Sequence, residues 1–293
     1  MDIVFSIYFS GIKIHFTFPE SVSFTDWKKS FVCKQCTDSA DSYYSVELIN
    51  KPLYTAPFKV YTYHNTSEYI TDEGRLRIYL PLIEPDGCQV ACLLRPDNHH
   101  TLYYPASRWD FYAHPLNCLH LIAPEHILIR KNAFLLHSSV VALHGKTVLF
   151  AGPSTAGKST QASLWQTHLG AEILNGDRCV VMQRDGQFWG GGSPWAGTSG
   201  IYRPEQYPIA GIVLLGKSPE NRIRRMGADA FAPLFGQTLV NSWDREFMET
   251  VTSLYADLLA QVPVYHLDCR PDADAVALAY QTIFGKEMPD GTR

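Results

Sequence analysis

The sequence predicts a chain of the α+β class in two parts, a mostly β domain over residues 1–130 and an α/β domain with a mixed sheet over residues 131–293. Short segments of alternating apolar and polar residues, dense in aromatic and β-branched side chains, predict strands through the first part. In the second part, strand-like segments alternate with segments of helical periodicity, which is typical of an α/β domain. Hairpin turns there add antiparallel pairs, so we expect the second sheet to be mixed.

The elements of the first domain are predicted from its alternation. Strands are expected at residues 12–18, 53–63, 76–83 and 89–94. Helical periodicity first occurs at 109–121, and the polar stretch 33–43 is expected to be a loop. This order predicts a sheet with little helix before residue 130.

The second domain opens with strands at 134–143 and 146–151, joined by a tight His-Gly turn. A helix is expected to begin after Gly157 and to end at Gly170. Further on, aspartates open two amphipathic helices as N-cap residues. The remaining expected elements are strands at 171–174, 179–182, 187–189, 209–215 and 262–267, a glycine-rich loop at 190–192, and helices at 244–261 and 272–284.

Composition excludes several classes of function. Of the 293 residues, 46% are hydrophobic and 18% charged, and the net charge is −4, so nothing favours nucleic acid or an anionic membrane surface as a partner. No apolar run approaches the ~20 residues of a membrane helix. No basic segment precedes the first apolar residues, so a signal peptide is not expected. The odd number of cysteines, seven, argues against a disulfide framework and favours the cytoplasm.

One motif in the second domain carries chemistry. Residues 152–159 read GPSTAGKS, which fits the P-loop (Walker A) pattern G-x-x-x-x-G-K-[ST] without a mismatch. Glycines let the backbone curl so that its N–H groups point inward, and the following helix adds its positive amino-terminal end. In this pattern Lys158 reaches the β- and γ-phosphates, and the Ser159 hydroxyl ligates Mg²⁺.

An apolar strand before this motif and a helix after it supply the context that a P-loop requires. The sequence therefore predicts a site for a nucleoside triphosphate with magnesium, and a glycine-rich turn with an exposed lysine is the alternative. The candidate nucleotide-binding residues are Gly152, Pro153, Ser154, Thr155, Ala156, Gly157, Lys158, Ser159 and Thr160.

The acid that completes such a site is expected at Asp177. In a typical P-loop ATPase a later apolar strand ends in an acid, but the best such strand here, 211–215, is followed by Gly-Lys. The nearer segment LNGDR follows Lys158 after an interval that fits one helix, a turn and one strand. Asp177 is therefore expected at the carboxyl end of a neighbouring strand, where it would hold Mg²⁺ or accept the proton of an attacking hydroxyl. An ordinary Gly-Asp turn is the alternative.

These motifs in order resemble a known family. The string LHSS at 136–139, a short hairpin, GPSTAGKST, ILNGDR and a glycine-rich segment resemble the HPr kinase/phosphorylase proteins, whose catalytic domain is related to phosphoenolpyruvate carboxykinase. The match covers about residues 130–285, and the first domain does not resemble the regulatory domain of those kinases. The resemblance implies an HPr-kinase-like P-loop domain that uses ATP or GTP with Mg²⁺.

The resemblance also implies roles for particular residues. His137 would lie beside the transferred phosphate, although packing within its strand is the alternative. Lys158 would contact the phosphates, and Asp177 would accept the proton of the substrate hydroxyl. Ser159 and Asp177 would hold the metal. Arg203, in a loosely matching segment, would approach the phosphates.

Two departures narrow the expected activity. The HPr kinases carry paired acids where this chain has Gly176-Asp177, and their Leu-Glu-Ile-Arg-Gly segment with its metal-binding glutamate is replaced by GSPWAG at 192–197. Reverse phosphorylase activity and recognition of HPr are therefore not expected. The lysine, histidine and aspartate set of the carboxykinases is not found either, so decarboxylation is not expected.

The expected function is an ATP-dependent kinase that transfers the γ-phosphoryl group to a serine or threonine hydroxyl of a peptide or small protein. Similar proteins with the Asn-Gly-Asp-Arg string include kinases of precursor peptides, and a small-molecule hydroxyl is the second choice of acceptor. The rival from another class is a nucleotide-gated module that binds a peptide or protein with little catalysis. HPr kinases are homo-oligomers, which makes a homo-oligomer one of the expectations.

Overall fold

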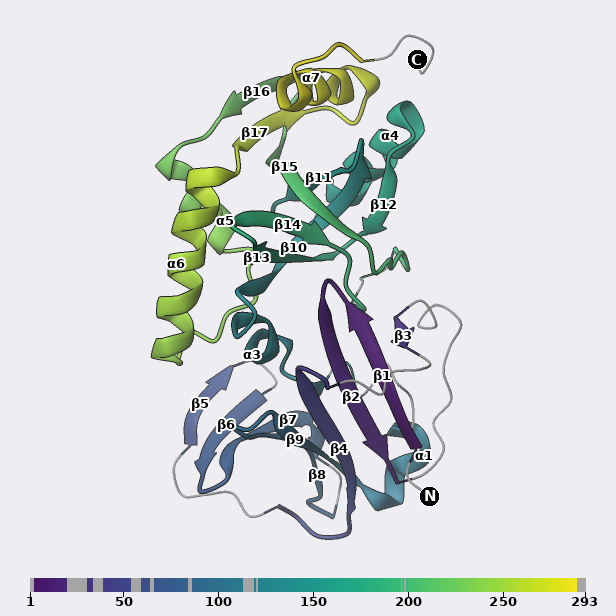
Figure 1. The fold of residues 1–293 in the computed structure, drawn as a ribbon, viewed down its shortest axis with the longest axis vertical. Coiled ribbons are helices and arrows are strands. Elements are labelled where there is room, and N and C mark those ends of the chain that lie inside the picture. The colour runs from purple at the N-terminus through teal and green to yellow at the C-terminus, as the bar shows by residue number, and fades with distance from the viewer. Residues whose placement is uncertain are drawn as a thin grey trace. The chain divides into compact units, whose positions relative to one another are not determined.

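The computed structural model of the chain describes residues 3–19, 31–33, 39–53, 59–63, 66–83, 86–112, 119, 121–195, 197 and 199–288. By its internal contacts the chain divides into two units, Met1–Ile127 and Leu128–Arg293, each with a sheet of its own (Figure 1). Mixed sheets combined with helices are compatible with the predicted α+β class. None of the helices in the described ranges has the length and apolar character needed to cross a membrane.

The first unit is mostly β. Its strands are β1 (Ile3–Phe9), β2 (Ile12–Phe18), β3 (Val32–Cys33), β4 (Ser42–Ile49), β5 (Lys59–Tyr63), β6 (Thr66–Thr71), β7 (Gly74–Ile83), β8 (Gln89–Leu94) and β9 (His99–Pro105). Within the described residues they form a nine-stranded sheet with the order β3-β1-β2-β4-β9-β8-β7-β6-β5. The pairs β2–β4 and β4–β9 are parallel. The chain continues through η2 (Ala106–Arg108), α1 (Trp109–Tyr112) and α3 (Pro124–Ile129).

Alternation decides which face of β2 is buried. Ile12, Ile14, Phe16 and Phe18 are fully buried, whereas the residues between them are partly exposed. Because successive side chains of a strand point to opposite faces, this register places all four apolar side chains on one face. The predicted strands 12–18, 76–83 and 89–94 are confirmed as β2, part of β7 and β8.

Other predictions for this unit differ from the structure or fall outside it. The predicted loop 33–43 is wrong at both ends, because Cys33 pairs in β3 and Ser42 begins β4, and residues 34–38 lie outside the described residues. Residues at both ends of the predicted loop are strand residues because they pair with strands distant in the sequence. Polar composition gives no information about such pairing. The strands β1, β4, β6 and β9 were not predicted. Residues 54–58 of the strand predicted at 53–63, and residues 113–118 and 120 of the helix predicted at 109–121, lie outside the described residues.

The second unit combines strands and helices. Its strands are β10 (Ala133–Leu143), β11 (Lys146–Ala151), β12 (Glu172–Asn175), β13 (Arg178–Arg184), β14 (Gln187–Gly191), β15 (Gln206–Lys217), β16 (Arg222–Arg225) and β17 (Val264–Cys269). Its helices are α4 (Lys158–Leu169), η3 (Ala228–Ala230), α5 (Phe231–Phe235), α6 (Arg245–Gln261) and α7 (Ala273–Phe284). The elements predicted for this part of the chain occur in the predicted order, whereas β16, η3 and α5 were not predicted.

The described strands of the second unit form an eight-stranded sheet with the order β11-β10-β13-β14-β15-β17-β16, and β12 pairs with β10. β11 also pairs with β15, which closes β10, β11, β15, β14 and β13 into a ring. The pairs β11–β15 and β15–β17 are parallel and the hairpins are antiparallel. The sheet is mixed, as predicted.

Two apolar cores lie on opposite faces of this sheet. Successive residues of β15, Val213 and Leu214, belong to different cores, as strand alternation requires. Trp165 of α4 and Tyr280 of α7 pack in one core, and Tyr255 of α6 packs in the other. Helices therefore cover both faces and leave the ends of the strands for loops.

The helix ends follow the predicted signals. α4 ends at Gly170, which has a left-handed φ of 64°. Asp244 and Asp272 are the N-cap residues of α6 and α7, and their side chains accept hydrogen bonds from the backbone N–H groups of Phe247 and Ala275.

The glycine-rich segment 190–192 is not the loop that was predicted, because Gly190 and Gly191 end β14. A Cβ on Gly190 would lie 2.8 Å from Thr147 Oγ1 and 3.0 Å from Leu149 Cδ1 of β11. The absence of a side chain at Gly190 lets β14 and β11 approach closely across the ring. Glycine within a strand often has this role.

Candidate functional site

The P-loop connects the end of β11 to the start of α4. Three of its residues have positive φ angles, Gly152 at 147°, Thr155 at 67° and Gly157 at 102°. Such left-handed residues turn successive backbone N–H groups into one concavity, which favours an anion. A Cβ on Gly152 would lie 3.1 Å from the Cβ of Ala156, so the loop is also tightly curled. Its conformation is that of an anion-binding loop at a helix amino terminus.

Lys158 is the first residue of α4 and is 7% exposed. Its Nζ donates hydrogen bonds to the carbonyl oxygens of Gly152 and Pro153, at 3.0 Å each. Burial lowers the pKa of Lys158, and the negative charge of Asp177 partly offsets that effect. The ammonium group therefore lies against the loop and within electrostatic reach of Asp177. Ser159 follows with an exposed side chain.

Asp177 lies in the turn between β12 and β13, and Asn175 holds that turn in place. The fully buried Asn175 accepts hydrogen bonds at its Oδ1 from the backbone N–H groups of Asp177 and Arg178, at 2.8 Å each. Its Nδ2 donates to the carbonyl oxygens of Ser193, at 3.0 Å, and Trp195, at 2.9 Å. An asparagine that bonds the backbone two residues on makes an Asx-turn. Because this one is fully hydrogen-bonded and buried, the position of Asp177 is well defined.

Two side chains contact the Asp177 carboxylate. His137 Nε2 is 3.2 Å from Oδ1, and Arg178 Nε is 3.4 Å from Oδ2. The hydrogen bond from His137 lowers the pKa of Asp177, and the charge of Arg178 adds to this effect against the opposing effect of burial. Asp177 is therefore ionised at neutral pH and, being 29% exposed, is accessible to a ligand.

Strand directions explain why Lys158 and Asp177 lie at the same edge of the sheet. β10 is antiparallel to both β11 and β12, so these two strands run in the same direction. Their carboxyl ends, which lead to the P-loop and to Asp177, therefore lie at the same edge of the sheet. Asp177 was predicted to follow a strand next to the P-loop strand. β12, which leads to Asp177, is instead separated from β11 by β10. The parallel pairs β11–β15 and β15–β17 bring the carboxyl ends of β15 and β17 to this edge as well.

A pocket of about 570 Å³ lies beside the P-loop. Its walls are the loop and first turns of α4 on one side and the segments that follow β15 and β17 on the other. The lining residues are Thr155, Ala156, Gly157, Thr160, Gln161, Lys217, Ser218, Pro219, Cys269, Arg270 and Pro271. This volume is within the usual range for small-molecule sites, and the pocket shares the loop with the predicted phosphate site.

The structure places Arg203 differently from the other predicted residues. Its guanidinium forms an ion pair with Glu172, at the start of β12. The preceding residue, Tyr202, forms a β-bridge with Asn175. Burial raises the pKa of Tyr202, and the negative charge of Asp177 contributes to the rise. The charge of Asp177 therefore acts on Tyr202, the residue before Arg203.

The donor set fits a magnesium–nucleotide complex. Magnesium in such sites is usually held by one or two protein oxygens together with phosphates and water. The Ser159 hydroxyl, on the first turn of α4, and the ionised Asp177 carboxylate supply oxygens of this kind from the same edge of the sheet. No cluster of three or more histidine, cysteine or acidic side chains suited to a metal occurs among the residues that the structure describes.

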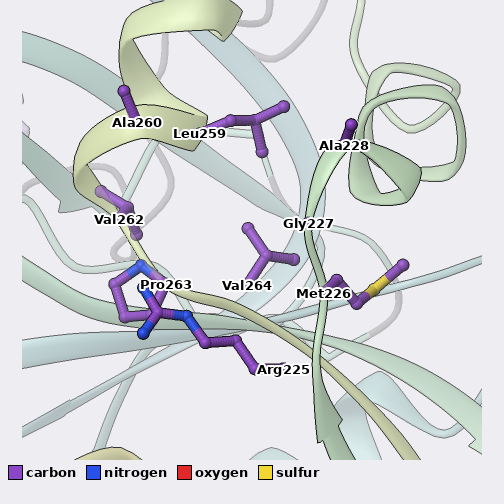
Figure 2. A pocket seen from close by; sticks show the side chains of 9 residues that line it. All are labelled: Arg225, Met226, Gly227, Ala228, Leu259, Ala260, Val262, Pro263 and Val264. Carbon is purple, nitrogen blue, oxygen red and sulfur yellow. The ribbon is translucent and has the colours of Figure 1, made fainter.

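A second cavity, of about 380 Å³, lies between the end of β16, the end of α6 and the start of β17. Figure 2 shows Leu259 and Val264 pointing into it. β17 runs from this cavity at Val264 to the P-loop pocket at Cys269, so the two cavities lie at opposite ends of one strand. No candidate nucleotide residue lines this second cavity.

Several residues of the site were not assigned roles from the sequence. Asn175 had a recognisable signal, because an asparagine directly before Gly-Asp, two residues ahead of the aspartate, is typical of an Asx-turn. Gln161 had one too, since it is three residues after Lys158 and therefore on the same face of the helix. Tyr202 and Cys269 had no such signal in the sequence, because only the pairing of distant strands brings them to the edge of the sheet where the site lies.

Comparisons with known proteins add little. No family model matches the sequence, and no curated protein matches it. Among solved structures, this chain is similar to the HPr(Ser) kinase/phosphatase from Coxiella burnetii. The match covers 52% of this chain and 88% of the other, with 14% sequence identity and a TM-score of 0.30. A TM-score this low does not establish a shared fold, so the function proposed below rests on the residues of this chain.

Proposed function

We propose that this protein is an ATP-dependent kinase that transfers the γ-phosphoryl group to a serine or threonine hydroxyl of a peptide or small protein. One observation carries the proposal: an intact P-loop with its lysine and an ionised, firmly positioned carboxylate lie at the same edge of one sheet. Phosphoryl transfer needs these two groups on either side of the reacting phosphate.

In the proposed reaction the residues of the chain have separate roles. The P-loop N–H groups and Lys158 bind the phosphates and stabilise the charge that develops during transfer. Asp177 accepts the proton of the attacking hydroxyl, and His137 and Arg178 orient its carboxylate. Ser159 and Asp177 would hold the magnesium ion, which would neutralise further phosphate charge when bound.

The peptide acceptor is supported by the surroundings of Asp177. Gly197 and Ser199 lie against its turn: a Cβ on Gly176 would lie 2.2 Å from Ser199 Oγ, and a Cβ on Gly197 would lie 3.1 Å from the Asp177 carboxyl carbon. The carboxylate nevertheless stays partly exposed, so a hydroxyl on an extended chain reaches it without opening a closed cavity. A small-molecule hydroxyl is the second candidate for the acceptor.

The test is transfer of label. The protein with Mg²⁺ and γ-labelled ATP is incubated with a library of serine- and threonine-containing peptides and, separately, with small hydroxyl compounds. We expect labelled phosphoserine or phosphothreonine in a subset of peptides and none with Lys158→Met. Tight ATP binding without transfer to any acceptor, and without hydrolysis, contradicts the kinase.

That last outcome supports the second candidate function, a nucleotide-gated binding module. The observation that favours it is that Gly176 occupies the position where the resembling kinases carry a second acid, so Asp177 has no neighbouring carboxylate in its turn. In such a module ATP would order the surface around Asp177 for a peptide. The prediction that distinguishes it is peptide affinity that rises when ATP is added, with the peptide recovered unmodified.

A further inference from the structure

We propose that the pocket beside the P-loop receives an adenine base and that Gln161 is the residue that selects adenine over guanine. The inference deepens the proposed function and rests on the nucleotide-binding part of it, because a triphosphate on the loop has this pocket next to it for its nucleoside. The pocket contains loop residues such as Thr155 and Gly157 together with Gln161 of α4.

The side-chain amide of Gln161 makes fewer hydrogen bonds in the fold than it is able to make. The side chain is 2% exposed, and its Oε1 has no hydrogen-bond partner among the described residues. Its Nε2 donates only to the Sγ of Cys269, at 3.3 Å, and a thiol sulfur is a weak acceptor. Both Gln161 and Cys269 line the pocket. A buried amide oxygen without a donor is costly, so the arrangement favours a ligand that brings one.

Adenine matches this amide. A glutamine amide forms two hydrogen bonds with the N6/N7 edge of adenine, accepting from the N6 amino group and donating to N7. In this pocket, Oε1 gains the donor it lacks, and Nε2 exchanges a weak sulfur acceptor for a ring nitrogen. The same edge of guanine presents two acceptors, N7 and O6, so O6 would face the glutamine oxygen. The flanking Pro219 and Pro271 supply apolar surface for a flat base.

Gln161→Met tests the assignment in the full chain. Methionine keeps the length of the side chain and removes the amide, and Gln166→Met, an exposed position on the same helix, is the matched control. Calorimetry measures the affinities for ATP, GTP and tripolyphosphate, each with Mg²⁺. We expect the original protein and the control to prefer ATP over GTP by on the order of tenfold or more. Gln161→Met is expected to lose that preference and to bind tripolyphosphate as before.

A second measurement needs no variant and so does not depend on how Gln161→Met folds. The original protein is titrated with 7-deaza-ATP, which lacks the N7 acceptor, and with N6,N6-dimethyl-ATP, which lacks the N6 donors. Each analogue is expected to bind on the order of tenfold more weakly than ATP. Equal affinity for ATP, GTP and both analogues overturns the assignment, as does an unchanged ATP preference in Gln161→Met.

These results separate failure of this inference from failure of the proposed function. Phosphoryl transfer that uses ATP and GTP equally well leaves the kinase intact and overturns the role of Gln161. Selective ATP binding without transfer keeps the role of Gln161 and contradicts the kinase. If neither nucleotide nor tripolyphosphate binds, both are wrong.

Discussion

Asp177 shows how much of this site depends on single residues and their immediate partners. Its carboxylate is held from two sides by His137 and Arg178, and its backbone N–H is held by Asn175. A carboxylate fixed in this way loses little freedom when it accepts a proton from a substrate, which is the benefit of a preorganised site. Lys158 is likewise held against the P-loop carbonyl oxygens rather than extended into water.

Asp177→Asn is expected to separate binding from chemistry. Asparagine keeps the shape and the hydrogen-bond acceptor but cannot take up the proton, so transfer should fall by roughly 10²–10⁴-fold. The affinity for ATP should change little, because the P-loop and Lys158 remain. Single-turnover transfer and equilibrium binding measure the two properties. Transfer by Asp177→Asn at the original rate would show that Asp177 is not the proton acceptor.

The pH dependence of stability gives a second prediction for Asp177. Its pKa in the folded protein is lowered by His137, whereas the unfolded chain has the ordinary value of about 3.9. The stabilisation is therefore fully present above that pH and is lost as the pH falls through the folded pKa. Denaturant unfolding of the original protein and of Asp177→Asn between pH 7 and pH 3 should show a difference in unfolding free energy that shrinks below about pH 4. A difference that grows as the pH falls contradicts the ion-pair geometry.

At the scale of elements, helix ends and strand edges follow local rules. α6 begins where the Asp244 side chain accepts the N–H of Phe247, and the apolar face that follows it, including Val251 and Leu258, is buried. β14 has a glycine at position 190 because β11 lies against it. The cap can be recognised in the sequence, whereas the strand glycines depend on a partner strand far away in it.

Asp244→Ala is expected to lower the unfolding free energy of the second unit by about 1 kcal/mol, because an N–H at the start of α6 loses its acceptor. Thr252→Ala, at an exposed position in the same helix, is the control and should change stability by less than about 0.5 kcal/mol. Urea denaturation followed by circular dichroism measures both. Equal effects of the two substitutions would show that the cap does not stabilise the helix.

A buried ionic group joins three elements of the first unit. Arg77 of β7 donates to Glu68 of β6 at 2.7 Å and to Glu125 of α3 at 2.6 Å, and all three side chains are buried. Burial raises the pKa of Glu125, but the charges of Arg77 and His126 and the hydrogen bonds to the carboxylate together outweigh burial, so the pKa is lowered overall. The group specifies where α3 docks on the sheet.

Arg77→Met should destabilise the first unit by about 3–5 kcal/mol, because it leaves two buried carboxylates without a counter-charge. Changing Glu68 and Glu125 to glutamine in the same protein should restore much of that loss, since the remaining groups are then neutral. Thermal and urea unfolding of the single and triple variants provide the measurement. A single variant as stable as the original protein would contradict the proposed role of the ion pairs.

At the scale of the whole molecule, the candidate site belongs to one unit. The P-loop, the Asp177 turn, and the ends of β15 and β17 all lie within Leu128–Arg293, which has its own sheet and two cores. The division into domains at residue 130 stays a prediction, as do the peptide partner, the homo-oligomer and the cytoplasmic location. What the first unit contributes is tested by removing it.

A fragment of residues 128–293 is therefore expected to fold and to bind Mg²⁺-ATP with an affinity within about tenfold of that of the full chain, because every candidate nucleotide residue is retained. Peptide phosphorylation should be the property that falls if the first unit recognises the acceptor. Calorimetry and the label-transfer assay measure the two. A folded fragment without ATP affinity would show that the nucleotide site needs both units.

The sequence by itself determined the local parts of this protein. The P-loop and its flanking strand and helix, the caps at Asp244 and Asp272, and the alternation of β2 all follow from residues close together in the chain, because backbone geometry and side-chain period are local properties. Tertiary structure decided what lies beside them. β10, antiparallel to both β11 and β12, brings Asp177 to Lys158, and the parallel pairs of β15 bring Cys269 to Gln161. The pairing of strands distant in the sequence is decided by packing across the whole sheet, and no short stretch of sequence contains that information.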